Sequence, residues 1–472
     1  MIHTFRQNGY NIVLDVASGS VHSVDDVAFD VINLYEGTPR EEIISGVAKK
    51  HGISEDEVRE CLADIDTLKA EGSLFSEDTF KPDADVLAKR DTVIKALCLH
   101  VAHTCNLNCE YCFAAQGKYH GERALMSFEV GKRALDFLIE NSGTRHNLEV
   151  DFFGGEPLMN FEVVKQLVAY ARSIQKEHGK HFRFTLTTNG MLLDDDVIDF
   201  ANREMDNVVL SLDGRKEVND RFRKTVGDVG SYDIIVPKFQ KFVKARGDKS
   251  YYMRGTFTHF NPDFTKDIQT MLDLGFDELS MEPVVCPPTD KYALTEEDKT
   301  VICGEYEKLA DMMIERRKAG KPFTFYHYMI DLDGGPCIYK RVSGCGSGTE
   351  YLAVTPTGEL YPCHQFVGNK DYLMGDIWTG VKRTDIRDEF KKCNAYSRKE
   401  CADCWARLYC SGGCSANAYN ATGSISGVYK YGCDLFKKRI ECAIMLKADE
   451  AISGGDSVEN THSECNNCDD CH

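Results

Sequence analysis

The chain has 472 residues, which at about 150 residues per domain corresponds to roughly three domains and excludes a small stapled mini-protein. Hydrophobic residues make up 42% and charged residues 28%, an ordinary composition for a soluble globular protein. No apolar run approaches the roughly 18 residues of a membrane-spanning helix, and the N-terminal segment lacks the apolar core of a signal peptide. We therefore expect a cytoplasmic protein without a membrane partner.

The formal net charge is −19, from 56 Lys and Arg against 75 Asp and Glu. This excess opposes binding to a phosphate backbone, so no nucleic acid partner is expected. The 20 cysteines are clustered, and half of them lie from position 337 to position 442. Structural disulfides are rare in a reducing compartment, so the cysteines indicate metal or redox chemistry.

Residues 1–85 have the pattern of a separate small unit, in which two short strand-like runs precede three helical segments. The helices are expected at residues 25–35, 39–51 and 54–71, with N-caps at Asp25, Thr38 and Ser54. Ser54 and Glu57 have the spacing of a capping box. These elements predict a winged helix-turn-helix. The unit has 7 Lys and Arg against 18 Asp and Glu, which argues against a DNA-reading face.

From residue 92 to about 320, strand-like runs alternate with amphipathic helical patterns. Six strands are expected, in the segments VIKALCLHV, LEVDFF, RFTLTT, NVVLSLD, YYMRGTF and ELSMEPV. This alternation predicts an α/β fold with a parallel sheet, and six units favour a partial (β/α)6 barrel. Functional residues are then expected at the carboxyl ends of the strands.

A helical bridge at residues 295–320 leads to a third part, residues 337–445, which is rich in Cys and Gly. We expect ligand bonds rather than a large apolar core to hold this part together. Residues 453–472 contain no Lys or Arg and are expected to form a disordered tail. The tail contains three cysteines to which we assign no role: Cys465, Cys468 and Cys471.

Cys105, Cys109 and Cys112 form a C-x3-C-x2-C loop directly after the first of these six strands. Three thiolates can bind three irons of a cubane cluster and leave the fourth iron open to a substrate or cofactor. Zinc, with His103 as a fourth ligand, is the alternative occupant of this loop.

This loop, with Tyr111 before its last cysteine, resembles the signature of the radical S-adenosylmethionine superfamily. Three further motifs end successive predicted strands: GGEP at 154–157, TTNG at 187–190 and SLDG at 211–214. The resemblance implies contacts to the methionine amino group from Gly154, Gly155 and Glu156. It also implies that Ser211 and Asp213 lie near the ribose, and that Arg223 pairs with the methionine carboxylate.

Seven further cysteines form a second array: Cys345, Cys363, Cys401, Cys404, Cys410, Cys414 and Cys433. This array resembles the SPASM domain, which carries auxiliary iron–sulfur clusters; a zinc-ribbon pair is the alternative. The resemblance implies one auxiliary [4Fe–4S] cluster on Cys401, Cys404, Cys410 and Cys433. It implies a second on Cys345, Cys363 and Cys414. Cys337 is a candidate for the missing ligand, and without it one iron is open to a substrate thiolate. With the first cluster, three [4Fe–4S] clusters and S-adenosylmethionine are the expected cofactors.

His364 follows Cys363, at a position where the similar sulfatase-maturing enzymes have an Asp proposed as a base. This difference argues against sulfatase maturation, although a His beside a cluster is a candidate for proton transfer or can donate to a sulfide.

The N-terminal unit resembles the elements that hold the leader of a ribosomally made peptide as an additional strand. Residues 1 to about 445 resemble the thioether-forming SPASM peptide maturases, in particular those that act on the Cys-rich SCIFF peptides. This resemblance implies an oxidoreductase that bonds a peptide cysteine to a carbon atom. Its partners would be a Cys-rich precursor peptide with a leader and an electron donor such as a flavodoxin or ferredoxin. The motifs leave open carbon–carbon linkage, epimerisation and, as another class, a metal-sensing DNA-binding regulator.

Overall fold

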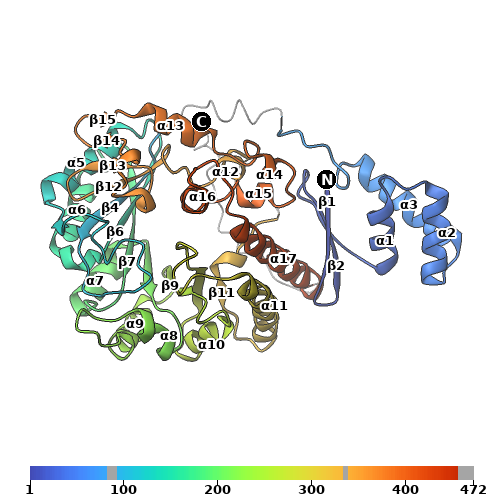
Figure 1. Ribbon diagram of the computed structural model, residues 1–472, viewed down its shortest axis with the longest axis horizontal. Coiled ribbons are helices and arrows are strands. Elements are labelled where there is room, and N and C mark those ends of the chain that lie inside the picture. The colour runs from blue at the N-terminus through green and yellow to red at the C-terminus, as the bar shows by residue number, and fades with distance from the viewer. Residues whose placement is uncertain (82–92, 333–337, 455–472) are drawn as a thin grey trace.

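The computed structural model describes residues 1–81, 93–332 and 338–454, and Figure 1 shows their arrangement. Its N-terminal part is an antiparallel sheet of three strands followed by three helices. The strands are β1 (Ile2–Gln7), β2 (Tyr10–Asp15) and β3 (Val21–Val24), in that order across the sheet. The helices are α1 (Asp26–Leu34), α2 (Arg40–His51) and α3 (Glu55–Ala70). The strands thus all precede the helices, and the winged helix-turn-helix stays a prediction.

The N-caps of the first and third helices follow the local sequence signals. The Asp25 side chain accepts a hydrogen bond from the backbone N–H of Ala28, and Ser54 forms the predicted capping box with Glu57. The prediction of Thr38 was wrong, because α2 begins after Pro39, which has no side-chain acceptor. The fixed φ of proline already suits the first turn of a helix.

The N-terminal sheet is covered on both faces. Ile12 and Leu14 of β2 belong to the main apolar core, whereas Val13 between them belongs to a second core formed with α1, α2 and α3. This alternation follows from the two-residue period of a strand. In Figure 1 the three helices accordingly lie at the right, beyond β1 and β2, and the long helix α17 (Lys430–Ser453) lies at the left of these strands.

The central sheet contains the six predicted strands as parallel neighbours in chain order. They are β4 (Ala96–His103), β6 (Asn147–Gly154), β7 (His181–Thr188), β8 (Asn207–Ser211), β9 (Tyr251–Phe257) and β10 (Glu278–Pro283). The helices between them are α5 (Phe128–Glu140), α6 (Phe161–Ile174), α7 (Asp195–Glu204), α8 (Lys216–Phe222), α9 (Tyr232–Arg246) and α10 (Thr265–Asp273). Two further short strands join this sheet, β5 (Ala124–Leu125) on β4 and β11 (Thr324–Phe325) on β10.

The two faces of these strands differ in polarity. On β6, Leu148, Val150 and Phe152 are fully buried in the main core, whereas Glu149 and Asp151 lie on the opposite face. β9 likewise alternates buried Met253 with exposed Arg254 on the second face. The polar face of the sheet is therefore the one that can receive a polar ligand.

The C-terminal part extends the same sheet. β12 (Tyr351–Val354) pairs in parallel with β4, and the antiparallel strands β13 (Glu359–Tyr361), β14 (Gly375–Asp376) and β15 (Gly380–Val381) follow it. Its helices are α12 (Ile338–Ser343), α13 (Thr384–Lys392), α14 (Lys399–Ala402), α15 (Arg407–Cys410), α16 (Ser415–Thr422) and α17. The bridge helix α11 (Glu296–Lys318) packs against α17.

This part was expected to lack a large apolar core, but in the structure its residues belong to the main apolar core. Leu352, Phe366, Phe390 and Ile444 are buried in the same core as the central strands. Pairing of β12 with β4 extends that core from the central sheet into the C-terminal part. Cys337 and nearly all of the 453–472 tail lie outside the described residues. No helix in the described ranges is long and apolar enough to cross a membrane.

Candidate active site and auxiliary cysteine centres

The loop that carries Cys105, Cys109 and Cys112 follows β4. Where β4 ends and this loop begins, the main chain contacts the GGEP turn at the end of β6. The backbone N–H of Gly155 donates to the carbonyl of Ala102 (2.8 Å), and that of Glu156 donates to the carbonyl of Thr104 (2.9 Å). A Cβ atom on Gly155 would lie 2.2 Å from the oxygen of Thr104. Glycine is therefore required where the two strand ends meet.

The three thiols of this loop influence one another electrostatically. Burial, the carboxylate of Glu156 and the other two thiols together raise the pKa of Cys105 to about 12. Burial also raises the pKa of Cys109 to about 11, against the opposing charge of Arg223. A bound metal would instead lower the pKa of these thiols, because metals bind thiolates. Across the described ranges, no three His, Cys, Asp or Glu side chains are gathered so as to hold a single metal ion.

His103, the residue predicted as a possible zinc ligand, is bonded elsewhere. Its Nε2 lies 3.1 Å from Nδ1 of His100, and both side chains are buried. Burial lowers the pKa of His103 to about 4. The thiol-only donor set of the loop fits an iron–sulfur cluster with one open iron.

Glu156 is bonded to the chain itself. Its carboxylate accepts hydrogen bonds from the backbone N–H of Leu158 (3.0 Å) and Asn189 (2.8 Å) and from the Thr188 hydroxyl (2.8 Å). The residue is 1% exposed, and burial raises its pKa to about 7. Glu156 therefore ties the GGEP turn to the TTNG motif at the end of β7, and the glycine backbone is left as the surface for a ligand.

Tyr111 anchors the cysteine loop to the far side of the site. Its hydroxyl donates to the carboxylate of Asp213 (2.6 Å) and accepts from a guanidinium nitrogen of Arg223 (3.1 Å). Asp213 is fully buried and also accepts from the backbone N–H of Thr256 (3.0 Å). Asp213 and Arg223 thus fix the cysteine loop through their hydrogen bonds to Tyr111.

Arg254 of β9 was not singled out from the sequence. It is the register partner of Ser211 on β8, and its side chain is exposed on the polar face of the sheet. Its positive charge helps to lower the pKa of His364 and of His327. A single Arg within a strand gives no motif, and only the alternation of YYMRGTF could have placed it on this face.

His364 belongs to the C-terminal part and lies in a short 3-10 helix, His364–Phe366, that contacts residues near the cysteine loop. Its ring is 5.2 Å from Phe153 of β6 and 5.7 Å from Phe113, which follows Cys112. Its Nδ1 is 3.3 Å from the hydroxyl of Tyr351 on β12. Burial and then Arg254 lower its pKa to about 4, so the imidazole is neutral at pH 7.

The other seven predicted ligands lie in the C-terminal part, and thiols assigned to the same predicted set act on one another electrostatically. Burial and then the charges of Cys433, Cys401 and Cys404 raise the pKa of Cys410 to about 12. Burial also raises the pKa of Cys363, with smaller contributions from Cys414 and Cys345. The assignment of these thiols to two auxiliary clusters stays a prediction.

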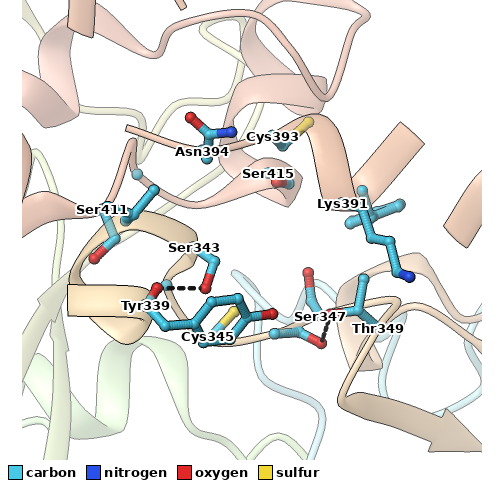
Figure 2. Close-up of a pocket in the computed structure, with 15 residues that line it drawn as sticks. Tyr339, Ser343, Cys345, Ser347, Thr349, Lys391, Cys393, Asn394, Ser411 and Ser415 are labelled. Atoms are coloured by element: carbon cyan, nitrogen blue, oxygen red, sulfur yellow. Dashed lines mark hydrogen bonds between the residues drawn. The ribbon is translucent and has the colours of Figure 1, made fainter. Parts of the chain in front are cut away.

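Cys345 lines a pocket at the surface of the C-terminal part. Figure 2 shows its side chain at one wall, with Ser411 and Ser415 on the opposite side. Gly344 and Gly346, both with positive φ, flank Cys345 in this wall. The thiol is accessible within a turn of main chain, which suits a bound cluster.

Comparisons with known proteins agree with these motifs. Residues 99–274 match the Radical SAM superfamily, and residues 345–405 match an iron–sulfur cluster-binding domain, SPASM. The radical SAM cyclopropyl synthase TigE of Paramaledivibacter caminithermalis is 22% identical over 372 residues, which cover 73% of this chain and 72% of TigE. A cysteine-type anaerobic sulfatase-maturating enzyme of Clostridium perfringens is 25% identical over 340 residues, 66% of this chain and 85% of that enzyme.

Two solved structures have a similar fold. The structure titled "Native anSMEcpe with bound AdoMet and Cp18Cys peptide" has a TM-score of 0.64 at 22% identity, covering 76% of this chain and 99% of that one. Streptococcus suis SuiB bound to the precursor peptide SuiA has a TM-score of 0.51 at 15% identity, covering 90% of this chain and 97% of that one. Together with the cysteine loop and the motifs at the strand ends, these matches show that the chain carries a radical SAM domain followed by a SPASM domain.

Proposed function

We propose that this protein is a peptide maturase that installs thioether bonds between cysteine and carbon in a Cys-rich precursor peptide, with S-adenosylmethionine and three [4Fe–4S] clusters as cofactors. The observation that carries the proposal is the arrangement of the cysteines. Cys105, Cys109 and Cys112 lie on the loop after β4. Phe113, next to Cys112, contacts the ring of His364, next to Cys363, with ring centroids 5.7 Å apart. The relatives named above that act on peptides support a peptide substrate.

Each part of the site has a distinct role in this proposal. When bound, the reduced cluster with S-adenosylmethionine supplies a hydrogen-abstracting carbon radical, which no side chain provides. The Gly154–Gly155 backbone receives the methionine amino group, and Glu156 holds that backbone in place. His364, next to Cys363, stays the candidate for proton transfer, although its lowered pKa makes it a weak base toward a substrate thiol. Cys345, Cys363 and Cys414 would hold an auxiliary cluster, which would supply the acceptor for the electron released as the bond forms.

We further propose that Arg254, rather than Arg223, binds the methionine carboxylate together with Ser211. Arg223 is 8% exposed and bonded to Tyr111, whereas Arg254 is exposed beside Ser211. Arg254→Ala should weaken S-adenosylmethionine binding about tenfold or more, as expected for a lost charge-assisted pair. Arg183→Ala, on strand β7 of the same sheet, is the control, and both variants are measured by calorimetric titration of the iron-loaded protein. Equal binding by the Arg254 variant and the control would contradict this role.

The precursor peptide would bind through a leader at the free edge of β3. β3 pairs only with β2 within the described residues, while β1 packs along α17. An extended leader can add to such an edge through main-chain hydrogen bonds. Tethering then raises the effective concentration of the core peptide at the carboxyl ends of the central strands.

The direct test uses anaerobically reconstituted protein, a chemical reductant, S-adenosylmethionine and a Cys-rich precursor peptide. We expect the peptide to lose two hydrogens and one alkylatable thiol per thioether. Cys105→Ala should abolish the change, whereas Cys303→Ala, a half-buried cysteine of α11 outside the three sets, should retain it. A flavodoxin or ferredoxin can then replace the reductant.

Other outcomes of the same test identify the alternatives. A two-hydrogen loss with all thiols still alkylatable indicates carbon–carbon linkage, which would contradict thioether formation. An unchanged mass with an inverted residue indicates epimerisation. A colourless protein that contains zinc and no sulfide would contradict the radical chemistry altogether and favour a metal-sensing regulator.

A further inference from the structure

The segment between Cys404 and Cys410 is held by residues from the N-terminal part of the chain. The indole of Trp405 stacks on the imidazole of His3, with ring centroids 3.8 Å apart and planes 5° apart. Arg407 donates to the carboxylate of Asp78 at 2.6 Å. Both contacts join this segment to residues more than three hundred positions earlier in the chain.

The ion pair joins the buried guanidinium of Arg407 to the partly exposed carboxylate of Asp78 and fixes the main chain at a cysteine. The Arg407 side chain is 3% exposed, and it also donates to the carbonyl of Cys404 (3.1 Å). Asp78 accepts a second hydrogen bond from the hydroxyl of Tyr396 (3.0 Å). Removing the partner of a buried charge leaves that charge uncompensated, so Arg407 without Asp78 must move toward water and release Cys404.

His3 adds a second connection on the other side of this centre. Its Nε2 lies 3.0 Å from the carboxylate of Glu441 on α17, the helix that carries Cys433 near its start. His3 therefore lies between the Cys404–Cys410 segment and the helix that supplies the fourth thiol of the set.

We infer that Asp78 and His3 are positioning residues for the four-cysteine centre of Cys401, Cys404, Cys410 and Cys433. The N-terminal unit is then a structural part of that centre as well as a separate peptide-binding surface. The inference depends on the proposed function only for the identity of iron as occupant, because the placement of the thiols is a property of the chain itself.

The test compares Asp78→Asn with Asp78→Glu, which keeps the charge, and with Glu41→Gln. Glu41 belongs to the same unit, but its pair with Arg59 lies at the surface. In the iron-free chain, alkylation of Cys404 and Cys410 should be about tenfold faster in Asp78→Asn and near the wild-type rate in the other two. Cys105, followed in the same samples by peptide mass spectrometry, should not change.

The iron-loaded protein supplies a second readout. In Asp78→Asn, one auxiliary cluster should either lose its iron or show a changed reduction potential and electron paramagnetic resonance signal. In Asp78→Glu, the iron content, the potential and the signal should be those of the wild type. His3→Ala should act in the same direction. Wild-type alkylation rates in Asp78→Asn and His3→Ala, or equal acceleration at Cys105, would overturn the inference. A wild-type chain that binds no iron would contradict the proposed function, whereas the alkylation rates would still decide this inference.

Discussion

At the scale of single residues, the site is stabilised by buried polar groups that bond to one another. Tyr111 is a clear case, since its one hydroxyl hydrogen-bonds to both Asp213 and Arg223. The fully buried Asp213 also has a pKa raised by burial, against the opposing charge of Arg223. Loss of a shared hydroxyl would leave two buried groups short of a partner.

Tyr111→Phe is therefore expected to lower the free energy of unfolding by about 1–3 kcal/mol. It should also loosen the cysteine loop and reduce iron bound at Cys105, Cys109 and Cys112. The exposed Tyr326 provides the control variant Tyr326→Phe. Chemical denaturation and iron analysis check both effects, and a Tyr111 variant as stable as the control would contradict the anchoring role.

At the scale of elements, the position of the cysteine loop depends on how closely it approaches the end of β6. Gly155 permits this approach, since a Cβ atom there would lie 2.2 Å from the oxygen and 2.7 Å from the carbonyl carbon of Thr104. Both contacts are with main chain, which cannot rotate away as a flexible side chain can. The strand end and the loop would therefore have to separate.

Gly155→Ala is expected to leave most of the fold intact while reducing iron and S-adenosylmethionine binding severely. Steric crowding of this kind costs about 1–3 kcal/mol. Gly304→Ala, in α11 with open space around it, should be neutral or slightly stabilising. Iron content and thermal unfolding of the two variants provide the measurement. Full iron binding by the Gly155 variant would show that the close approach is not required.

Prediction from sequence succeeds for these elements where the determinants are local. The six central strands and the Ser54 capping box follow from residue patterns a few positions long. The pairing of β12 with β4 joins segments about 255 residues apart, and no periodicity within either segment specifies it. The position of Arg254 beside Ser211 was missed for the same reason, because the two residues lie on different strands.

At the scale of the whole molecule, the parts named from the sequence share a core. Residues of β2, β6, β12 and α17 all belong to it, so the C-terminal part does not depend on metal ligands alone. We therefore expect the iron-free chain to keep β12 and most of α17 folded. Hydrogen exchange of these two elements should be slow with and without iron, apart from the cysteine-bearing turns. Rapid exchange throughout residues 351–381 without iron would contradict a shared core, since it would indicate metal-dependent folding.

The N-terminal sheet, enclosed between its own helices and α17, limits how such enzymes can be re-targeted. A chimera that replaced the first 81 residues wholesale would need to reproduce the face of Ile12 and Leu14 as well as the anchors His3 and Asp78. Grafting only the outer edge at β3 avoids this requirement. Under the leader-binding role proposed for β3, engineering for new precursor peptides would begin with that strand, and the inward face would be kept unchanged.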